Sequence, residues 1–209
     1  MSYQAFNARA DEYDAWYDNE PGKTISAMEV ECLQPLLHCY PRPYLEVGVG
    51  SGRFAQALRI EYGAESAPAL AQMASARGIK VSEVSAEALP FPDEMFGGIL
   101  MAFTLCFLDN PRKALEEAWR VLQPGGGLVL GLIFRDSPWG KFYAAKGRKG
   151  HPIYRQAKFS SKEEIDSLLQ TCGFKVVDFC STLFQPPGQS TYRLEPPVSG
   201  YQQAAGFVR

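Results

Sequence analysis

A glycine-rich turn directly after a short apolar stretch constrains the fold of this 209-residue chain more than any other feature. Residues 44–47 (Tyr-Leu-Glu-Val) have the length and character of a buried strand, and residues 53–58 have those of a helix. The glycines between them permit a tight turn, and the start of the helix offers free N–H groups to a ligand. This order predicts the opening unit of an α/β domain.

Strands and helices continue to alternate after the turn. The strands are expected to be apolar throughout in the middle of the chain, which is typical of a parallel sheet covered on both faces. We therefore predict an α/β fold, Rossmann-like and doubly wound, with a seven-stranded, mostly parallel sheet and helices on both faces. The expected strands are 44–47, 60–64, 79–84, a part of 96–107, 128–134, 175–179 and 206–209.

Residues that favour helix ends mark the intervening helices. Ser66 with Pro68, and Asp109 or Asn110 with Pro111, are typical helix starts. A capping box, formed by Ser160 or Ser161 with Glu163 or Glu164, predicts a helix that ends at Gly173.

The chain is expected to be a single domain over 1–209 with two attachments. Residues 1–40 are predicted to form a helical cap, in which Tyr13, Trp16 and Tyr17 share one helical face. A second helix of this cap is expected to start at Thr24, and Pro35 is expected to kink it or end it early. Residues 135–160 are predicted to form a lid-like insertion after the fifth strand.

Composition excludes several classes of protein. With 21 basic and 23 acidic residues the net charge is −2, which gives no general attraction to nucleic acid or to an anionic membrane. The longest apolar runs, 99–108 and 128–134, are about half as long as a bilayer requires. Residues 1–10 lack the features of a signal peptide, so we expect a cytoplasmic protein.

The cysteines indicate neither disulfides nor a metal site. There are five of them, with no C-x-x-C pair, and only two histidines. A disulfide framework favours an even number, and structural zinc favours closely spaced ligand pairs. We expect reduced cysteines, no metal, and a packing role for Cys106, which lies within an apolar run.

The glycine turn differs from two common nucleotide-binding patterns. A dinucleotide fingerprint has Gly or Ala three residues after its second glycine, where this chain has Arg53, and no Gly-Lys-Ser/Thr follows as a P-loop requires. Glu65 lies 19 residues after Glu46, at the end of the second expected strand. A carboxylate there can accept both hydroxyl hydrogens of a ribose; the alternative is an exposed glutamate at a strand end.

With these residues in view, the sequence resembles the class I S-adenosylmethionine-dependent methyltransferases, in the group that includes quinone-biosynthesis and other small-molecule enzymes. The resemblance covers roughly residues 44–179. Four segments carry it in the expected order, namely 45–52 (LEVGVGSG), 64–66 (AES), 86–91 (AEALPF) and 114–126 (ALEEAWRVLQPGG).

The resemblance implies S-adenosyl-L-methionine as the cofactor and assigns residues to its parts. Glu46 and the turn would hold the methionine end of the cofactor, and Glu65 would bind the ribose. Residues at the end of the third strand would lie at the edge of the adenine, and residues at the end of the fourth strand would flank the methionine part. Aromatic residues of the N-terminal cap would cover the cofactor. The residues so implied are Tyr17, Glu46, Gly48, Val49, Gly50, Ser51, Gly52, Glu65, Ser66, Ser85, Ala86, Glu87, Ala102 and Thr104.

Two positions depart from the family pattern. Ser85 stands where an acid commonly precedes the Ala-Glu pair, which puts a side-chain contact with the adenine amino group in doubt. Gly97 stands where an Asp usually opens the fourth strand.

The implied reaction is methyl transfer by in-line displacement. The cofactor carries an activated methyl group, so the protein needs chiefly to bind and align the two reactants. No catalytic residue can be assigned from the sequence. His151 and Tyr154 follow the fifth strand, where a base would lie, although a lone loop histidine is more often a solvated surface residue.

The predicted lid contains a group of basic residues interleaved with aromatic ones. We expect it, together with Tyr13, Trp16 and Tyr17, to admit a small acceptor that bears carboxylate or phosphate; the alternative is a solvated surface. Nucleic acid is not expected, because Ala102-Phe103-Thr104-Leu105 replaces the Asn/Asp-Pro-Pro-Tyr/Phe motif of base-amino methyltransferases. The basic residues are Arg135, Lys141, Lys146, Arg148, Lys149, Arg155 and Lys158.

The function predicted from the sequence is therefore transfer of a methyl group from S-adenosylmethionine to a small molecule. Two alternatives stay open. One is a nicotinamide-dependent oxidoreductase, which would share the sheet and the turn. The other is a non-catalytic protein that binds S-adenosylmethionine.

Overall fold

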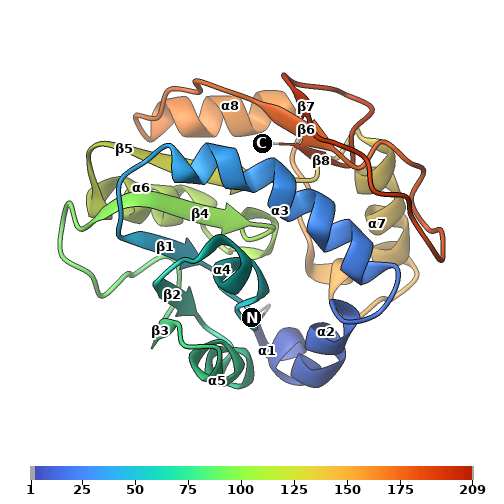
Figure 1. Ribbon diagram of the computed structural model, residues 1–209, viewed down its shortest axis with the longest axis horizontal. Coiled ribbons are helices and arrows are strands. Elements are labelled where there is room, and N and C mark those ends of the chain that lie inside the picture. The colour runs from blue at the N-terminus through green and yellow to red at the C-terminus, as the bar shows by residue number, and fades with distance from the viewer. Residues whose placement is uncertain (1–2, 209) are drawn as a thin grey trace.

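Five parallel strands form the centre of the molecule, in the order β3-β2-β1-β4-β5 (Figure 1). This computed structural model describes residues 3–208. All residues of β1 and β4 are buried, as continuous apolar sequence predicts for strands covered on both faces. The strands are β1 (Tyr44–Val47), β2 (Tyr62–Glu65), β3 (Lys80–Glu83), β4 (Phe96–Ala102) and β5 (Leu122–Gly131).

Helices cover both faces of this sheet. One core cluster joins α3 and α4 to one face, and a second joins α6 and α8 to the other, with Ile99 and Leu100 on opposite sides of β4. The helices are α1 (Tyr3–Asn7), α2 (Ala10–Trp16), α3 (Gly22–His38), α4 (Arg53–Leu58), α5 (Pro68–Ala76), α6 (Pro111–Val121), α7 (Pro138–Arg148) and α8 (Lys162–Thr171). The α/β fold class is thus confirmed.

The prediction of a seven-stranded sheet is wrong. Within residues 3–208 the parallel sheet has five strands, and β6 (Cys180–Thr182), β7 (Val198–Ser199) and β8 (Phe207–Val208) form a separate antiparallel sheet. The expected strand at 175–179 is irregular, with Val177 69% exposed. Leu183 and Phe207, by contrast, are buried in the core cluster of α3. Burial of these apolar side chains therefore favours pairing among the strands β6, β7 and β8 over the addition of a strand beside β5.

Pro35 does not end the long N-terminal helix early, which is one of the two effects expected of it. α3 starts at Gly22 rather than Thr24 and runs through Pro35 to His38. A proline inside a helix costs about 3 kcal/mol, whereas each fully buried side chain such as Leu33 or Leu37 contributes roughly 1.5–3 kcal/mol. Packing of this apolar face outweighs the lost hydrogen bond.

Most of the predicted helix signals are found in the structure. The side chain of Asn110 accepts a hydrogen bond from Lys113 N, and Ser161 forms the capping box with Glu164. Ser66 is not a cap, because α5 starts one residue later, with Ala67 at the N-cap. Gly173 has a positive φ of +86° just after α8.

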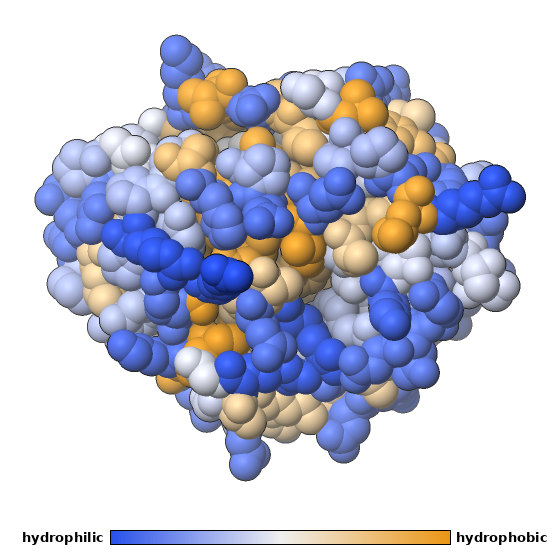
Figure 2. Space-filling view, in the orientation of Figure 1, coloured by the Kyte–Doolittle hydropathy of each residue, from blue (hydrophilic) through white to orange (hydrophobic). Residues whose placement is uncertain are grey.

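The outer surface in the view of Figure 1 is mostly hydrophilic. Figure 2 shows hydrophobic side chains mainly in recesses near the centre of this face. Within residues 3–208, every helix is too short or too polar to cross a bilayer. All five cysteines are free, as expected.

Candidate functional site

A cavity of about 610 Å³ lies where the strands β1, β2 and β4 end. Gly48 follows β1, Glu65 ends β2 and Ala102 ends β4, and all three line the cavity. Parallel strands point their carboxyl ends to the same edge, which brings these distant residues together. The N-terminal helices and α7 lie across from this edge (Figure 1), and their residues form the other wall.

The glycine turn fits closely between two side chains. Gly48 and Gly50 have φ values of +75° and +55°, which side-chain-bearing residues rarely adopt. A Cβ at Gly48 would lie 2.5 Å from Thr104 Oγ1, and one at Gly50 would lie 3.2 Å from Tyr13 Oη. Thr104 Oγ1 in turn donates to the Val47 carbonyl at 2.8 Å. The main chain of the turn is thereby held open toward the cavity.

Glu65 is tied to this turn. Its Oε2 accepts from Gly50 N at 2.8 Å, and its Oε1 accepts from Ser66 N and Ala67 N at 2.9 Å. Burial raises the pKa of Glu65, and the three backbone donors work against that rise. Oε1 already accepts two hydrogen bonds, so Oε2 is the oxygen that keeps acceptor capacity for a ligand hydroxyl. The alternative of an exposed strand-end glutamate is wrong, because Glu65 is only 9% exposed.

Glu46 lies beneath the turn in the core. It is 1% exposed, and burial raises its pKa while a hydrogen bond from the Ala55 backbone lowers it. Within residues 3–208 its Oε2 has no hydrogen-bond partner. A buried acceptor without a donor costs free energy, so this oxygen is a candidate to bind a donor at the turn.

Arg53 connects the turn to the N-terminal wall. Its Nε and Nη2 donate to the two oxygens of Asp14, both at 2.8 Å, and further bonds reach Asp18. Arg77 also donates to Asp14, and to Ser51 O at 2.7 Å. Burial opposes ionisation of Asp14, but the two guanidinium groups outweigh it and hold its pKa well below the usual range. Arg53, which stands where the dinucleotide fingerprint has Gly or Ala, thus attaches α2 to the turn.

Most of the residues predicted at the cofactor line the cavity. These are Tyr17, Gly48, Gly50, Glu65, Ser66, Ser85, Ala86, Glu87, Ala102 and Thr104. Glu46, Val49, Ser51 and Gly52 are buried and are not part of the lining. Val49 packs against Gly63, and Gly52 leaves no room for a side chain beside Ala74. The roles assigned to all these residues stay predictions.

The family departure at Gly97 has a local cause. A Cβ there would collide with the Pro41 carbonyl. At the other departure, Ser85 Oγ accepts from Glu87 N at 3.2 Å, and Glu87 Oε1 accepts from Asn110 N at 2.8 Å. Glu87 therefore fastens the start of α6 as well as lining the cavity.

Tyrosines and His151 line the part of the cavity away from the turn. The Tyr143 and Tyr154 rings lie 4.4 Å apart, and His151 lies 4.5 Å from Tyr154. Burial and the charge of Lys146 lower the pKa of His151, and its Nδ1 accepts from Ile153 N at 3.3 Å. The neutral ring therefore carries its proton on Nε2 and acts there as a donor rather than a base.

Cys106 also reaches this cavity, which the expectation of a pure packing role did not include. Its Sγ donates to Phe103 O at 3.3 Å. Burial raises the pKa of Cys106 to about 12, so the thiol stays protonated and is a weak nucleophile.

Glu29 is a buried acid in the lining that sequence reasoning missed. It lies on α3 among buried neighbours such as Ile25 and Leu33, and it is 3% exposed. An acid within a buried helical stripe is itself a signal, since carboxylates are rarely buried without a partner.

Of the basic residues in the predicted lid, Lys146 lines the cavity. Its ammonium lies 4.6 Å from the Phe142 ring centre, and its side chain is exposed. Arg135 instead bonds to Glu164 at 3.0 Å, outside the cavity. The prediction of an anionic acceptor therefore depends on Lys146.

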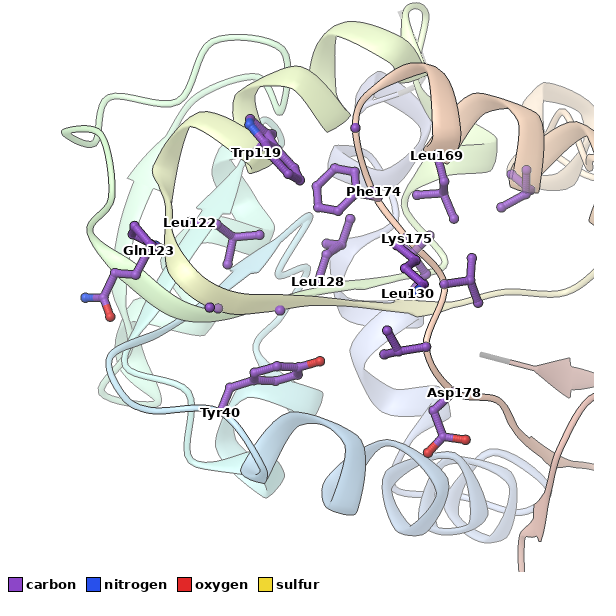
Figure 3. Close-up of a pocket in the computed structure, with 18 of the residues that line it drawn as sticks. Tyr40, Trp119, Leu122, Gln123, Leu128, Leu130, Leu169, Phe174, Lys175 and Asp178 are labelled. Atoms are coloured by element: carbon purple, nitrogen blue, oxygen red, sulfur yellow. The ribbon is translucent and has the colours of Figure 1, made fainter.

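A second cavity, of about 640 Å³, runs along the outer edge of β5. Figure 3 shows Trp119 and Phe174 on one side of that strand and Tyr40 on the other. The Trp119 and Phe174 rings meet edge to face at 5.0 Å. The charged residues that line this second cavity are exposed or half-buried, so it lacks the buried titratable groups that mark the first cavity. In residues 3–208 we find no cluster of side chains able to hold a metal ion.

Comparisons with known proteins agree with this geometry. The family described as "Methyltransferase domain" matches residues 45–130, which include the turn and Glu65. An uncharacterized protein of Mycobacterium tuberculosis is 43% identical over 196 residues, covering 94% of this chain and 69% of that protein. The demethylmenaquinone methyltransferase of Thermus thermophilus is 38% identical over 114 residues, about half of each chain (49% and 51%).

A solved structure is similar over the whole length. It is a Thermotoga maritima protein described as a SAM-dependent methyltransferase and possible histamine N-methyltransferase. The sequence identity is 35% and the TM-score is 0.89, and the alignment covers 100% of this chain and 97% of that one.

Proposed function

Because this chain belongs to the class I S-adenosylmethionine-dependent methyltransferases, in their quinone-biosynthesis-like group, we propose that it transfers a methyl group from S-adenosylmethionine to a small molecule. The observation that carries this proposal is one cavity that joins the glycine turn and Glu65 to a compartment lined by tyrosines. Its volume of about 610 Å³ is in the range of small-molecule sites. The family also removes the reason to consider a nicotinamide-dependent oxidoreductase.

The residues at the turn suit an adenosyl amino acid. Glu65 Oε2 has acceptor capacity left for a ribose hydroxyl, and the main chain at Gly48 and Gly50 lines the cavity. Glu46 Oε2 is buried and lacks a partner within residues 3–208, as an acceptor awaiting an ammonium donor would. These features support S-adenosylmethionine as the ligand.

The bound cofactor would supply a methyl group activated by a positively charged sulfur. The chain's own task is to align the acceptor with that methyl group and to keep water out. Burial raises the pKa of Tyr17 and Tyr143 well above the usual value, so both phenols stay protonated and donate hydrogen bonds. With His151 also a donor, the site favours an acceptor that is nucleophilic without a dedicated base.

The charge of the acceptor is a separate proposal. Lys146 supports an acceptor with carboxylate or phosphate, bound near the exposed side of the cavity. The two relatives are described as a demethylmenaquinone methyltransferase and a possible histamine N-methyltransferase, so their names support the transfer reaction rather than one acceptor.

Turnover of methyl-labelled S-adenosylmethionine against a panel of fractionated metabolites tests the proposal. We expect label in a small-molecule product and an equal amount of S-adenosylhomocysteine. Binding of the cofactor without transfer to any fraction would instead identify a non-catalytic binding protein.

A further inference from the structure

A buried carboxyl group with no partner among residues 3–208 faces the cavity. Glu29 lines the cavity from the middle of α3 and is 3% exposed. Within residues 3–208 the structure contains no hydrogen bond or ion pair to it. Burial alone raises the pKa of Glu29 well above its usual value. Such a group destabilises a fold unless something else requires it.

The neighbours of Glu29 are aromatic. Tyr17 comes from the end of α2, Tyr143 from α7 and Tyr154 from the following turn, and all three line the same cavity. Their phenols are close enough for the charge of Glu29 to contribute to their raised pKa values. The carboxyl group therefore lies among ring systems, and ring faces attract cations.

Two tyrosines of the N-terminal wall lie between the turn and the rest of that wall. Tyr13 lies beside Gly50, and its Oη is 3.0 Å from Tyr17 Oη. The charge of Glu29 contributes to the raised pKa values of Tyr17, Tyr143 and Tyr154, so the four side chains lie within electrostatic range of one another. Glu29 enters the cavity from α3, whereas the turn and Glu65 enter it from the strand ends, so we assign Glu29 to the acceptor part of the cavity.

We propose that Glu29 is a specificity-determining residue that binds a basic nitrogen of the methyl acceptor, so that the acceptor is an amine or an amine-bearing ring. This inference rests on the proposed methyltransferase function. An ammonium group offers three donors and a charge that compensates the buried carboxylate, and tyrosine rings line the same cavity. A hydroxyl lacks the compensating charge, and a carboxylate placed at Glu29 would be repelled; a carboxylate or phosphate of the same acceptor would lie at the exposed side, near Lys146.

Lys146 does not compete for this role. Its side chain is largely exposed. The partial loss of solvent around the ammonium lowers the pKa of Lys146, and Glu29 does not contribute to that shift. The two groups therefore act at different depths of the cavity, and Glu29 is the deeper one.

The test compares compounds that differ only in their head group. The amine, the alcohol and the carboxylic acid of three skeletons (n-butyl, cyclohexylmethyl and phenylethyl) are titrated by calorimetry into the protein saturated with S-adenosylhomocysteine. We expect at least one amine to bind about tenfold or more tightly than its alcohol, with the acid weakest. Glu29→Gln should abolish that preference.

The matched control is Glu31→Gln, a change at an exposed position of the same helix, which should keep the wild-type preference. Equal binding of amine and alcohol, no binding of any amine, or an unchanged preference in Glu29→Gln would each overturn the inference. The cofactor titration made first separates the two claims. Failure to bind S-adenosylhomocysteine refutes the proposed function, whereas failure after it binds refutes the role of Glu29 alone.

Discussion

Single residues at the turn after β1 fix where a ligand can approach. Because Gly48 has no side chain, Thr104 can lie directly against it, and Tyr13 lies against Gly50 for the same reason. Glu65 accepts hydrogen bonds from this turn and from the start of α5, so one carboxyl group joins two strand ends. The chemistry of the site depends on this small set of contacts.

Replacement of Gly48 by Ala should lower the affinity for S-adenosylmethionine by at least tenfold. The new Cβ would lie 2.5 Å from Thr104 Oγ1, so the turn must shift. Gly150→Ala is the matched control, because Gly150 also has a positive φ, of +88°, with nothing within 4 Å. Both variants should lose on the order of 1–2 kcal/mol of stability, but calorimetry should find weaker binding in Gly48→Ala alone. Equal affinities in the two variants would refute the role of the turn.

Glu29→Gln should stabilise the ligand-free protein, and more so as the pH rises. The pKa of Glu29 is raised in the folded state, so above about pH 4.3, the usual glutamate value, the unfolded chain releases a proton that the folded chain keeps. This contribution to stability is full below that pH and is lost as the pH rises toward the raised pKa. Gln has no such dependence.

Melting temperatures from pH 5 to pH 8 measure the effect, with Glu31→Gln as the control. A gain over wild type that grows with pH supports a carboxyl group kept for binding. A variant less stable than wild type at pH 8 would contradict this account.

The sequence predicts the residues of the turn better than those of the opposite wall. Gly48, Gly50 and Glu65 follow from local order and spacing, because strand ends of a parallel sheet converge. Glu29 does not, since helical periodicity places it in a buried stripe without indicating that a cavity opens there. Tyr143 likewise depends on how α7 packs.

At the scale of elements, charged residues attach α2 to the glycine turn. Asp14 forms ion pairs with both Arg53 and Arg77, and its side chain is 18% exposed. Partly buried bidentate pairs of this kind are stronger than surface ion pairs. The wall that carries Tyr13 and Tyr17 therefore depends on this contact.

Asp14→Asn should loosen α2 without unfolding the sheet. Amide hydrogen exchange in residues 10–16 should accelerate about tenfold or more, because two guanidinium groups lose their charged partner. Asp11→Asn, at an exposed position of the same helix, should exchange as wild type does. Exchange that rises equally in both variants, or in the sheet as much as in α2, would count against the docking role.

The same contact has a defined pH dependence. The pKa of Asp14 is lowered in the folded state, so its stabilising contribution is complete above about pH 4 and is lost as the pH falls through the folded value. Faster exchange in α2 should therefore appear first in acid.

The boundaries of the helices and strands show which stabilising forces can be recognised from the local sequence. The strands β1 and β4 and the capped helices α6 and α8 follow from continuous apolar residues and from side-chain caps. The early helix end expected at Pro35 and the strand expected at 175–179 are wrong, because tertiary burial decided both. The packing of α3 tolerates the proline, and the core around Leu183 takes the chain away from β5.

For the whole molecule, the cavity is assembled from segments far apart in the chain. The N-terminal helices, the strand ends and α7 surround it (Figure 1). A ligand that contacts all of them should stabilise the folded state as one unit. At one hundred times its dissociation constant, S-adenosylmethionine should add about 2.7 kcal/mol.

This corresponds to a rise in melting temperature of roughly 5–11 °C for a chain of this size. Differential scanning fluorimetry measures the rise, and NAD at the same concentration is the control. A larger rise with NAD would contradict the proposed ligand.

The most direct test is a calorimetric titration of the intact protein with S-adenosylmethionine, repeated with Glu65→Gln. We predict one site per chain and a loss of affinity of about 10–100-fold in the variant, as expected when a charged hydrogen bond worth about 1.5–3 kcal/mol is removed. Glu83→Gln, which changes the neighbouring strand end at an exposed position, should bind as wild type does. No heat of binding in the wild type, or equal affinity in wild type and Glu65→Gln, would contradict the assignment.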